Sequence, residues 1–340
     1  MTWYITREAV KDALDIKATA RSDAQIDRCI ATATDQITGL LRRQFDPLSA
    51  TLRFPAPAGQ TLWFGRRSLV SVTSVSVDGV ALDDADYLLL PLDDGPPYDG
   101  IRIVATSTAS LFGGEDPAVS ITGVWGYDLT EITAGATAEA LDAAETSVDL
   151  NGEASAAVGV GSVIRVDSER MTVTARSLLS TGVTLSANLT AAKADTAVTV
   201  SSGAGVTVGE TVLIDAEYMK VHAVAGNVLL VTRAVDGSTL ATHTSGATLY
   251  APRTVTVTRG ALGTTAATHT DASVVRVWQP PPLVGELALA YALTSLGQSQ
   301  AGYARTVGSN ENEREASGRG LKQIQEHAMR EYKRWLTGAV

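Results

Sequence analysis

Residues 131–278 contain an internal repeat, which limits the folds open to this chain more than any other feature of its sequence. Eight residues between Val160 and Val173 recur with a constant spacing of 48 positions. The matched pairs are Val160 and Val208, Gly161 and Gly209, Ile164 and Val212, Val166 and Ile214, Asp167 and Asp215, Glu169 and Glu217, Met171 and Met219, and Val173 and Val221. A repeat of this length usually means that one supersecondary unit is used again.

Two shorter similarities accompany this repeat and use other spacings. Upstream, with a spacing of 50, Thr146, Val148 and Leu150 match Thr196, Val198 and Val200. Downstream, with a spacing of 26, Thr232–Arg233, Gly237 and Ala241–Thr242–His243 match Thr258–Arg259, Gly263 and Ala267–Thr268–His269. The glycines and alternating apolar residues predict that the repeated unit is a set of short strands and turns.

The charge of the chain is concentrated in its middle. The 340 residues carry a formal net charge of −10, but residues 1–48 are neutral and residues 283–340 are net +1. The segment between them is therefore net −11. Because phosphate contacts supply most of the affinity of a free nucleic-acid binder, the overall acidity argues against that class of protein.

The sequence carries no targeting signal that we recognise. The N-terminal residues lack a basic segment followed by an apolar run, and no apolar stretch reaches about 18 residues. We therefore expect no signal peptide and no membrane span, and a protein that works in a cytoplasm or on a particle assembled there.

Both ends of the chain have helical patterns. Thr6 can cap a short helix through about Leu14, and Ser22 with Gln25 forms a capping box before a second helix. The apolar face of the second helix consists of Ile26, Cys29, Ile30, Ala33, Ile37, Leu40 and Leu41. At the other end, we expect a helix from Leu283 to about Leu296, a polar loop over 297–312, and a last helix over about 313–336.

Residues 51–127 favour strands. The alternation within Leu69–Val77 changes phase near Thr73–Ser74, which predicts a bulge or break, and Asp78–Gly79 predicts a type I′ hairpin turn. The expected strands are Thr61–Phe64, Leu69–Val77, Tyr87–Leu92, Ile101–Val104 and Val119–Trp125. We therefore expect an α+β fold, with a helical core and a small sheet or hairpin formed by 1–130 and 279–340, and a β-rich repeat insertion domain formed by 131–278.

The two ends resemble phage head-to-tail connector (adaptor) proteins, of the type found in long-tailed actinobacterial phages. The N-terminal motif consists of Thr6, Glu8, Lys11, Leu14 and Ile16, followed by Leu40–Leu41–Arg42–Arg43–Gln44–Phe45 and the turn at Val77–Gly79. The C-terminal similarity covers Trp278, Pro280–Pro282, Gln298–Thr306 and Gly318–Ile324. The resemblance covers roughly half of the chain and does not include the long repeat.

The resemblance implies a structural protein of the virion rather than an enzyme. It implies a homo-oligomeric ring, usually of about twelve copies, in the neck between capsid and tail. The portal protein would lie above the ring and tail-side connector or terminator proteins below it. Genomic DNA would pass through the lumen without sequence-specific binding, and the particle would assemble in the host cytoplasm.

Two other functions stay open at this point. The chain could be another virion tail or decoration protein that binds through its β-repeats. It could also be a carbohydrate-binding or hydrolytic tail protein, which would need aromatic residues gathered on one sheet face. The five tryptophans are scattered along the sequence, at Trp3, Trp63, Trp125, Trp278 and Trp335.

Candidate chemistry is sparse. His243 and His269 could ligate zinc if the fold brought them together, and Asp167/Glu169 or Asp215/Glu217 could contribute to a calcium site, but a repeated turn motif explains both patterns. Cys29 is the only cysteine, which excludes a thiolate cluster within one chain. No nucleophile-elbow, zinc-protease or phosphate-loop motif occurs, so we expect no catalytic residues, no cofactor and no metal.

The expected binding residues lie near the C-terminus, around the polar loop. We expect this loop to be disordered in the free subunit and ordered after assembly, with Tyr303 and Arg305 as anchors. The interface candidates are Tyr303, Arg305, Arg314, Arg319, Lys322 and Trp335. The alternative for the basic residues is a solvated helix face, balanced by Glu311, Glu313 and Glu315.

Overall fold

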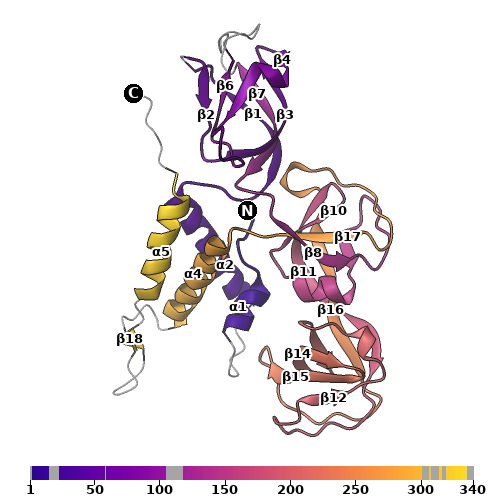
Figure 1. Ribbon diagram of the computed structural model, residues 1–340. Coiled ribbons are helices and arrows are strands. Elements are labelled where there is room, and N and C mark those ends of the chain that lie inside the picture. The colour runs from indigo at the N-terminus through magenta and orange to yellow at the C-terminus, as the bar shows by residue number, and fades with distance from the viewer. Residues whose placement is uncertain are drawn as a thin grey trace.

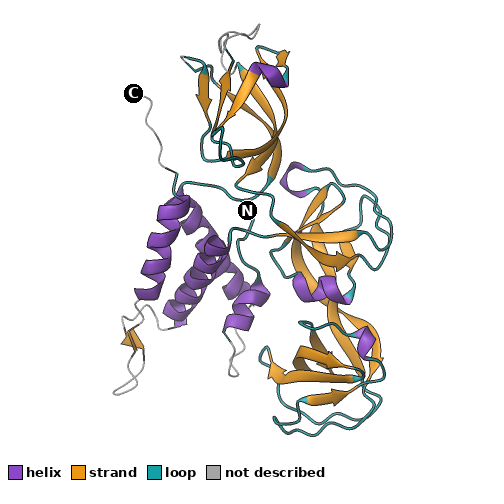
Figure 2. Ribbon diagram, in the orientation of Figure 1, coloured by secondary structure: helices purple, strands orange, loops and turns teal. Residues whose placement is uncertain are grey.

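The computed structural model describes residues 2–14, 23–57, 59–104, 118–300, 306–307, 314–315 and 319–334. Figure 1 shows four parts: a helical unit, an N-terminal β unit beside it, and two further β modules that follow one another along the same side. Figure 2 shows the longer helices gathered together, away from the three groups of strands.

The helical unit is built from the two ends of the chain. Its helices are α1 (Arg7–Ala13), α2 (Asp23–Leu41), α4 (Pro282–Gln300) and α5 (Arg319–Tyr332). Thr6 caps α1, since its Oγ1 accepts a hydrogen bond from the Ala9 N–H at 3.2 Å. None of the helices in the described part of the chain has the length and apolarity needed to cross a membrane.

The core of the helical unit continues into the neighbouring β structure. Tyr4 and Phe45 meet edge to face, with ring centroids 5.6 Å apart, and Tyr4 also contacts Trp278. Val163 and Trp278, which belong to β strands, are buried in the same cluster as Leu287 of α4. The helices and the adjacent β module therefore share one hydrophobic boundary.

The N-terminal β unit consists of two small antiparallel sheets around Trp125. The strand orders are β1-β7-β3-β4 and β2-β6-β5. The strands are β1 (Leu48–Phe54), β2 (Thr61–Trp63), β3 (Ser68–Val77), β4 (Val80–Leu82), β5 (Tyr87–Leu90), β6 (Gly100–Ile103) and β7 (Val119–Gly126). Register shifts between Leu69/Ser71 and Val72/Ser74 confirm the expected irregularity of β3, and positive φ at Asp78 and Gly79 confirms the turn.

The remaining strands form one ten-stranded antiparallel sheet that serves two hydrophobic cores. The elements are β8 (Glu131–Ala136), β9 (Ser147–Asp149), α3 (Gly152–Ala157), β10 (Val163–Val166), β11 (Glu169–Thr184), β12 (Ala197–Thr199), β13 (Thr211–Ile214), β14 (Glu217–Ala225), β15 (Val228–Val235), β16 (Thr248–Thr258) and β17 (Val274–Trp278). Strands β11 and β16 are long enough to contribute to both cores.

One module is inserted into a hairpin of the other. In the module of residues 178–253, Ala225 pairs with Val228 across the tight turn between β14 and β15. The equivalent pair in the other module is Ser177 with Thr254, but no turn joins these two residues. The chain between them forms the complete second module. We call residues 131–177 with 254–278 the host module, and residues 178–253 the nested module.

Nesting explains why the repeat has several spacings. The first part of the host module precedes the nested module, so matched residues such as Glu169 and Glu217 differ by 48 positions. The last part follows the nested module, so Arg259 lies 26 positions after its counterpart Arg233. The backbone contacts repeat as well, because Leu141 bridges His269 in one module and Leu189 bridges His243 in the other.

The expected α+β fold with a helical connector core is wrong. Strands account for 40% of the structure and helices for 25%, and the largest element is the ten-stranded antiparallel sheet. Capped amphipathic helices give the clearest local signals in this sequence, and such signals overstate the share of the fold that is helical. The short Ala/Thr/Val-rich strands are individually weak signals, but their long-range pairing organises most of the chain.

Several element boundaries also differ from the expected ones. Residues 48–54 form β1, which reaches into the segment expected to favour strands but matches none of the strands expected there, and α4 continues to Gln300 into the segment expected to be a loop. Within that segment and beyond it, Thr306–Val307 pairs with Arg314–Glu315 as β18 and β19. The last helix begins at Arg319 and ends at Tyr332, so it is shorter than expected at both ends.

Candidate functional site

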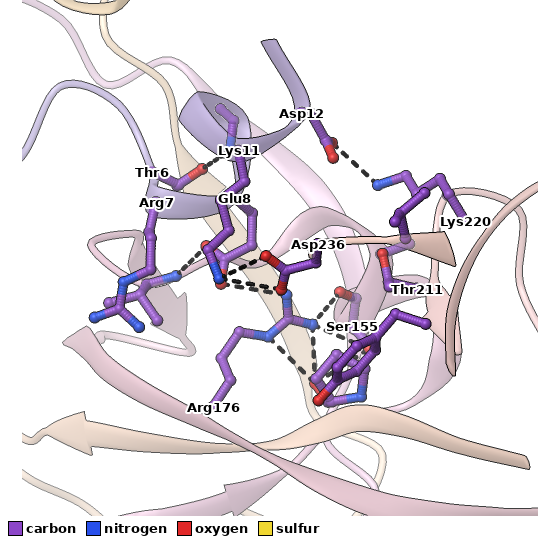
Figure 3. A pocket seen from close by; sticks show the side chains of 18 of the residues that line it. Thr6, Arg7, Glu8, Lys11, Asp12, Ser155, Arg176, Thr211, Lys220 and Asp236 are labelled. Carbon is purple, nitrogen blue, oxygen red and sulfur yellow. Dashed lines mark hydrogen bonds and ion pairs between the residues drawn. The ribbon is translucent and has the colours of Figure 1, made fainter. Parts of the chain in front are cut away.

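A cleft of about 830 Å³ lies between α1 and the two β modules (Figure 3). One wall is α1 with Asp23 of α2, and the other comes from both modules. The host-module wall includes Ser155–Val160 and Arg176, and the nested-module wall includes Lys220 and Asp236. The cleft therefore lies where the helical unit meets both modules.

The start of α1 is fixed to the host module through the segment between α3 and β10. The Glu8 carboxylate accepts a hydrogen bond from the Val160 N–H at 2.7 Å, and the Arg7 N–H donates to the Val160 carbonyl at 3.1 Å. Gly159 lies against Glu8 and Thr6 so closely that a Cβ at this position would overlap both side chains. The glycine thus permits the close contact between this segment and α1.

Ion pairs cross the cleft from α1 to the nested module. Lys11 Nζ lies 3.1 Å from Asp236 Oδ1 and 2.8 Å from Asp23 Oδ1. Lys220 Nζ lies 3.1 Å from Asp12 Oδ2. These side chains are partly exposed to solvent, so each pair contributes little to stability, but together they position α1 against the module.

Arg176 forms the floor of the cleft. Its Nη2 donates to the Ser155 carbonyl at 2.7 Å and to the Pro252 carbonyl at 2.8 Å, and its Nη1 lies 3.8 Å from Glu8 Oε1. Burial lowers the pKa of this guanidinium, although nearby Glu8 and Glu210 oppose the effect. Arg176 therefore connects the host module, Pro252 of β16 near the end of the nested module, and α1.

The cleft walls resemble a structural joint more than a catalytic centre. Their charged groups mostly pair with one another, as Figure 3 shows. The nearest arrangement to a nucleophile and base is Thr232 with His222, whose Oγ1 and Nε2 are 2.7 Å apart. Among the described residues, no acidic group is hydrogen-bonded to the other nitrogen of His222, which a working nucleophile–base pair would need for orientation.

A buried charged network lies in each module, formed by the repeated residues. In the nested module, Glu217 accepts hydrogen bonds from Arg233 Nε at 2.8 Å, Arg233 Nη2 at 2.7 Å and His243 Nε2 at 3.0 Å. The N–H groups of Ala234 and Ala241 also donate to it. Glu217, Arg233 and His243 have fully buried side chains, so this network is part of the core.

The host module contains the same network with matching distances. Glu169 accepts from Arg259 Nε and Nη2, both at 2.8 Å, and from His269 Nε2 at 2.9 Å. Gly260 and Ala267 supply the backbone N–H donors. The second nitrogen of each histidine bonds an exposed aspartate, Asp167 for His269 and Asp215 for His243.

The networks keep both glutamates ionised. Burial alone would raise the pKa of Glu169 and Glu217, but the hydrogen bonds from arginine and histidine outweigh it and lower both values to about 2. Each histidine ring lies between two carboxylates, one buried and one exposed.

This geometry decides between the alternatives for the repeated acids and histidines. His243 and His269 lie in different modules, and carboxylates occupy both nitrogens of each ring, so the fold does not pair them for zinc. Asp167 and Asp215 lie in tight turns with positive φ, while the glutamates two positions later point inward. No group of three or more His, Cys, Asp or Glu side chains in the described ranges could hold a metal ion.

Most of the interface residues expected from the sequence lie outside the part of the chain whose side chains the structure describes. Tyr303, Arg305 and Trp335 lie outside the described residues, and only the backbone is described at Arg314, in β19, and Arg319, at the start of α5. Lys322 is 77% exposed, and its Nζ lies 3.9 Å from Glu326 Oε1, one helical turn later. This position corresponds to a solvated helix face.

Sequence reasoning found the repeated letters but missed the network. The repeat gives Arg233 and Arg259 no role, and it places Glu169 and Glu217 in a repeated turn motif or a calcium site rather than in the core. A usable signal was present, because an acid, an arginine and a histidine recur together in both copies. An acid, an arginine and a histidine can form hydrogen bonds with one another when they are buried. Charged residues on a solvated surface need not recur together in this way.

The outer face of the β2-β6-β5 sheet is another candidate binding surface. Trp63 is 58% exposed, pairs across the sheet with Gly100, and has its ring over that glycine. A Cβ at Gly100 would lie 2.8 Å from the Trp63 ring, so the glycine makes room for the ring at this position. Leu88 and Leu90 of β5 lie on the same face by register. We call this surface the Trp63 face.

Comparison of the sequence with protein-family models, and of the chain with curated proteins and solved structures, found no match.

Proposed function

We propose that this chain is a structural subunit of a phage virion, a head–tail connector protein that assembles into a ring. Its function is binding rather than catalysis. The resemblance of residues around α1, α2 and α4 to connector proteins supports the proposal. The self-paired charges of the cleft also support it, because they join parts of the subunit instead of leaving groups free for a substrate.

The observation that carries the proposal is the presence of exposed apolar residues on different parts of the subunit. The Trp63 face lies on the N-terminal β unit, while Leu230 and Tyr250, on separate strands of the nested module, are 43% and 40% exposed. Figure 1 shows these two parts at opposite ends of the row of β units. A ring needs two different complementary faces on each copy, because its contacts are heterologous. Exposed apolar groups are typical of such contacts.

The proposed ring lies in the neck of the particle, with about twelve copies as in similar rings. It contacts the portal protein on one side and tail-side connector or terminator proteins on the other. The genome passes through its centre without sequence-specific contacts.

Native mass spectrometry of the purified chain, alone and mixed with its portal protein, tests this proposal. We expect a closed oligomer in at least one of the two samples. Trp63→Ser should reduce assembly at least tenfold, whereas Ile132→Ser should not, although Ile132 of β8 is also 46% exposed. A strict monomer in both samples would overturn the proposal.

A second candidate is a tail or decoration protein that binds through its β modules. The predominance of strand, at 40% of the structure, favours this alternative over a purely helix-based connector. The Trp63→Ser variant separates the two functions. A connector subunit should lose its ring contacts in this variant, whereas a decoration protein that binds through its β modules should keep its attachment to the particle.

A further inference from the structure

Two buried arginines share one carboxylate where α2, the N-terminal β unit and the end of α5 meet. Arg43 Nη2 lies 3.4 Å from Asp99 Oδ2, and Arg334 Nη1 lies 3.4 Å from Asp99 Oδ1. Ser68 Oγ donates to Asp99 at 2.5 Å and accepts from Arg43 Nη1 at 3.1 Å. We call Arg43, Ser68, Asp99 and Arg334 the arginine cluster.

Three distant parts of the sequence hold the arginine cluster together. The Arg334 N–H donates to the Leu41 carbonyl at 3.0 Å, which attaches the end of α5 to the end of α2. Arg334 Nη2 donates to the Asp99 carbonyl at 3.1 Å. The ring of Tyr127 covers Arg43, with the guanidinium carbon 5.2 Å from the ring centroid. The two arginines are therefore held in place by the fold rather than by their charges.

The cluster contains one positive charge more than its contacts neutralise. Arg43 and Arg334 are each 8% exposed, yet Asp99 is the only carboxylate that the described contacts give to either of them. The neighbouring Arg67 does not change this balance, since Asp46 pairs with it at 3.3 Å. Burial lowers the pKa of Arg334, and the nearby charge of Arg43 adds to that effect against the attraction of Asp99. An unpaired buried charge is strongly unfavourable.

Two N–H groups in the cluster are also unsatisfied. Arg43 Nε and Arg334 Nη1 are buried and have no hydrogen-bond partner within the described structure. Buried donors nearly always have a partner, so these two indicate a missing acceptor. The Asp99 side chain is 31% exposed, so the cluster is reached by solvent from that side.

We propose that the arginine cluster is a binding site for a phosphate group. Arginine forks recognise phosphate well because several oxygens can accept from them at once. A phosphate oxygen on each of Arg43 and Arg334 would supply the hydrogen bonds that Arg43 Nε and Arg334 Nη1 lack, and it would neutralise the excess charge. The group could be free inorganic phosphate or part of a nucleic-acid backbone. The proposal is independent of ring formation.

Titration with inorganic phosphate, followed by calorimetry and thermal unfolding, tests the site. We expect saturable binding and a rise in melting temperature that sodium chloride at equal ionic strength does not reproduce. Arg43→Gln and Arg334→Gln should each weaken phosphate binding at least tenfold. Arg53→Gln, at an exposed position of β1, is the matched control and should leave binding unchanged.

Asp99→Asn separates binding from a purely structural role. It removes the carboxylate that competes with phosphate, so phosphate should bind this variant more tightly and stabilise it more than the parent. A short DNA duplex, measured by fluorescence anisotropy, distinguishes the two sources of phosphate. Binding of inorganic phosphate or of the duplex that depends on Arg43 and Arg334 supports the proposal. Binding of neither, binding unaffected by both arginine variants, or weaker binding in Asp99→Asn overturns it.

Discussion

Arg233 donates two hydrogen bonds to Glu217, at 2.8 and 2.7 Å, in the interior of the nested module where both side chains are fully buried. Arg259 and Glu169 repeat this relationship in the host module. Each arginine also donates to backbone carbonyls, as Arg233 does to Thr190 and Ala241. The arginine thus holds nearby backbone in place as well as neutralising the glutamate, so removing it should strongly destabilise the module.

Replacing Arg233 should destabilise the nested module. Arg233→Met leaves Glu217 buried without its main partner, and we expect a loss of about 3–5 kcal/mol in the free energy of unfolding. Urea unfolding with hydrogen exchange across residues 178–253 measures the effect. The control is Lys193→Met, an exposed position in the same module, which should change stability by less than about 0.5 kcal/mol. Equal effects of the two variants would contradict a central role for the pair.

Because of the two glutamates, the free energy of unfolding should fall in acid. Their pKa in the folded state is about 2, below the ordinary value of 4.5, so their contribution to stability is complete above about pH 4.5. It is lost as the pH falls toward 2, by on the order of 3 kcal/mol per network. The free energy of unfolding between pH 6 and pH 2 should show this loss. Glu217→Gln should make the free energy of unfolding less dependent on pH in this range, whereas the exposed Glu153→Gln should leave the dependence as it is. An unchanged pH dependence in Glu217→Gln would count against the network.

The histidines offer a comparison within one module. His243→Ala removes two hydrogen bonds to carboxylates and leaves Glu217 with fewer donors, so we expect a loss of about 3 kcal/mol or more. His222→Ala removes one hydrogen bond, to Thr232, from an exposed position, and should cost less than about 1 kcal/mol. Thermal and urea unfolding of both variants measure the difference. Similar losses would show that His243 is not a structural centre of the module.

Local features of the fold were predictable from the sequence, while the long-range ones were not. The Thr6 cap, the turn at Asp78–Gly79 and the irregularity in β3 depend on residues close together in the chain. The pairing of Ser177 with Thr254 depends on a whole module folding between them. No local pattern contains that information, so the repeat was identified without its nesting.

The same distinction applies to the candidate sites. The acids and bases of the networks are among 37 acidic and 27 basic residues, and the sequence alone does not select which of them become partners. Only the fold buries Glu217 beside Arg233, or aims Arg43 and Arg334 at Asp99. The interface candidates expected from the sequence lie instead near the C-terminus, where the structure describes few side chains.

The nested module should be removable at the hairpin that it interrupts. Joining Ser177 to Thr254 through Gly-Asn would copy the turn that joins Ala225 to Val228, with the same pairing on either side. The host module keeps its own core and network but loses the Pro252 carbonyl that Arg176 contacts, so we expect it to fold with about 1–3 kcal/mol less stability. Circular dichroism and an amide NMR spectrum check the fold, and a flexible Gly/Ser linker in place of the turn is the control, expected to be less stable because it does not fix the register. An unfolded host module with either connection would show that the two modules depend on each other to fold.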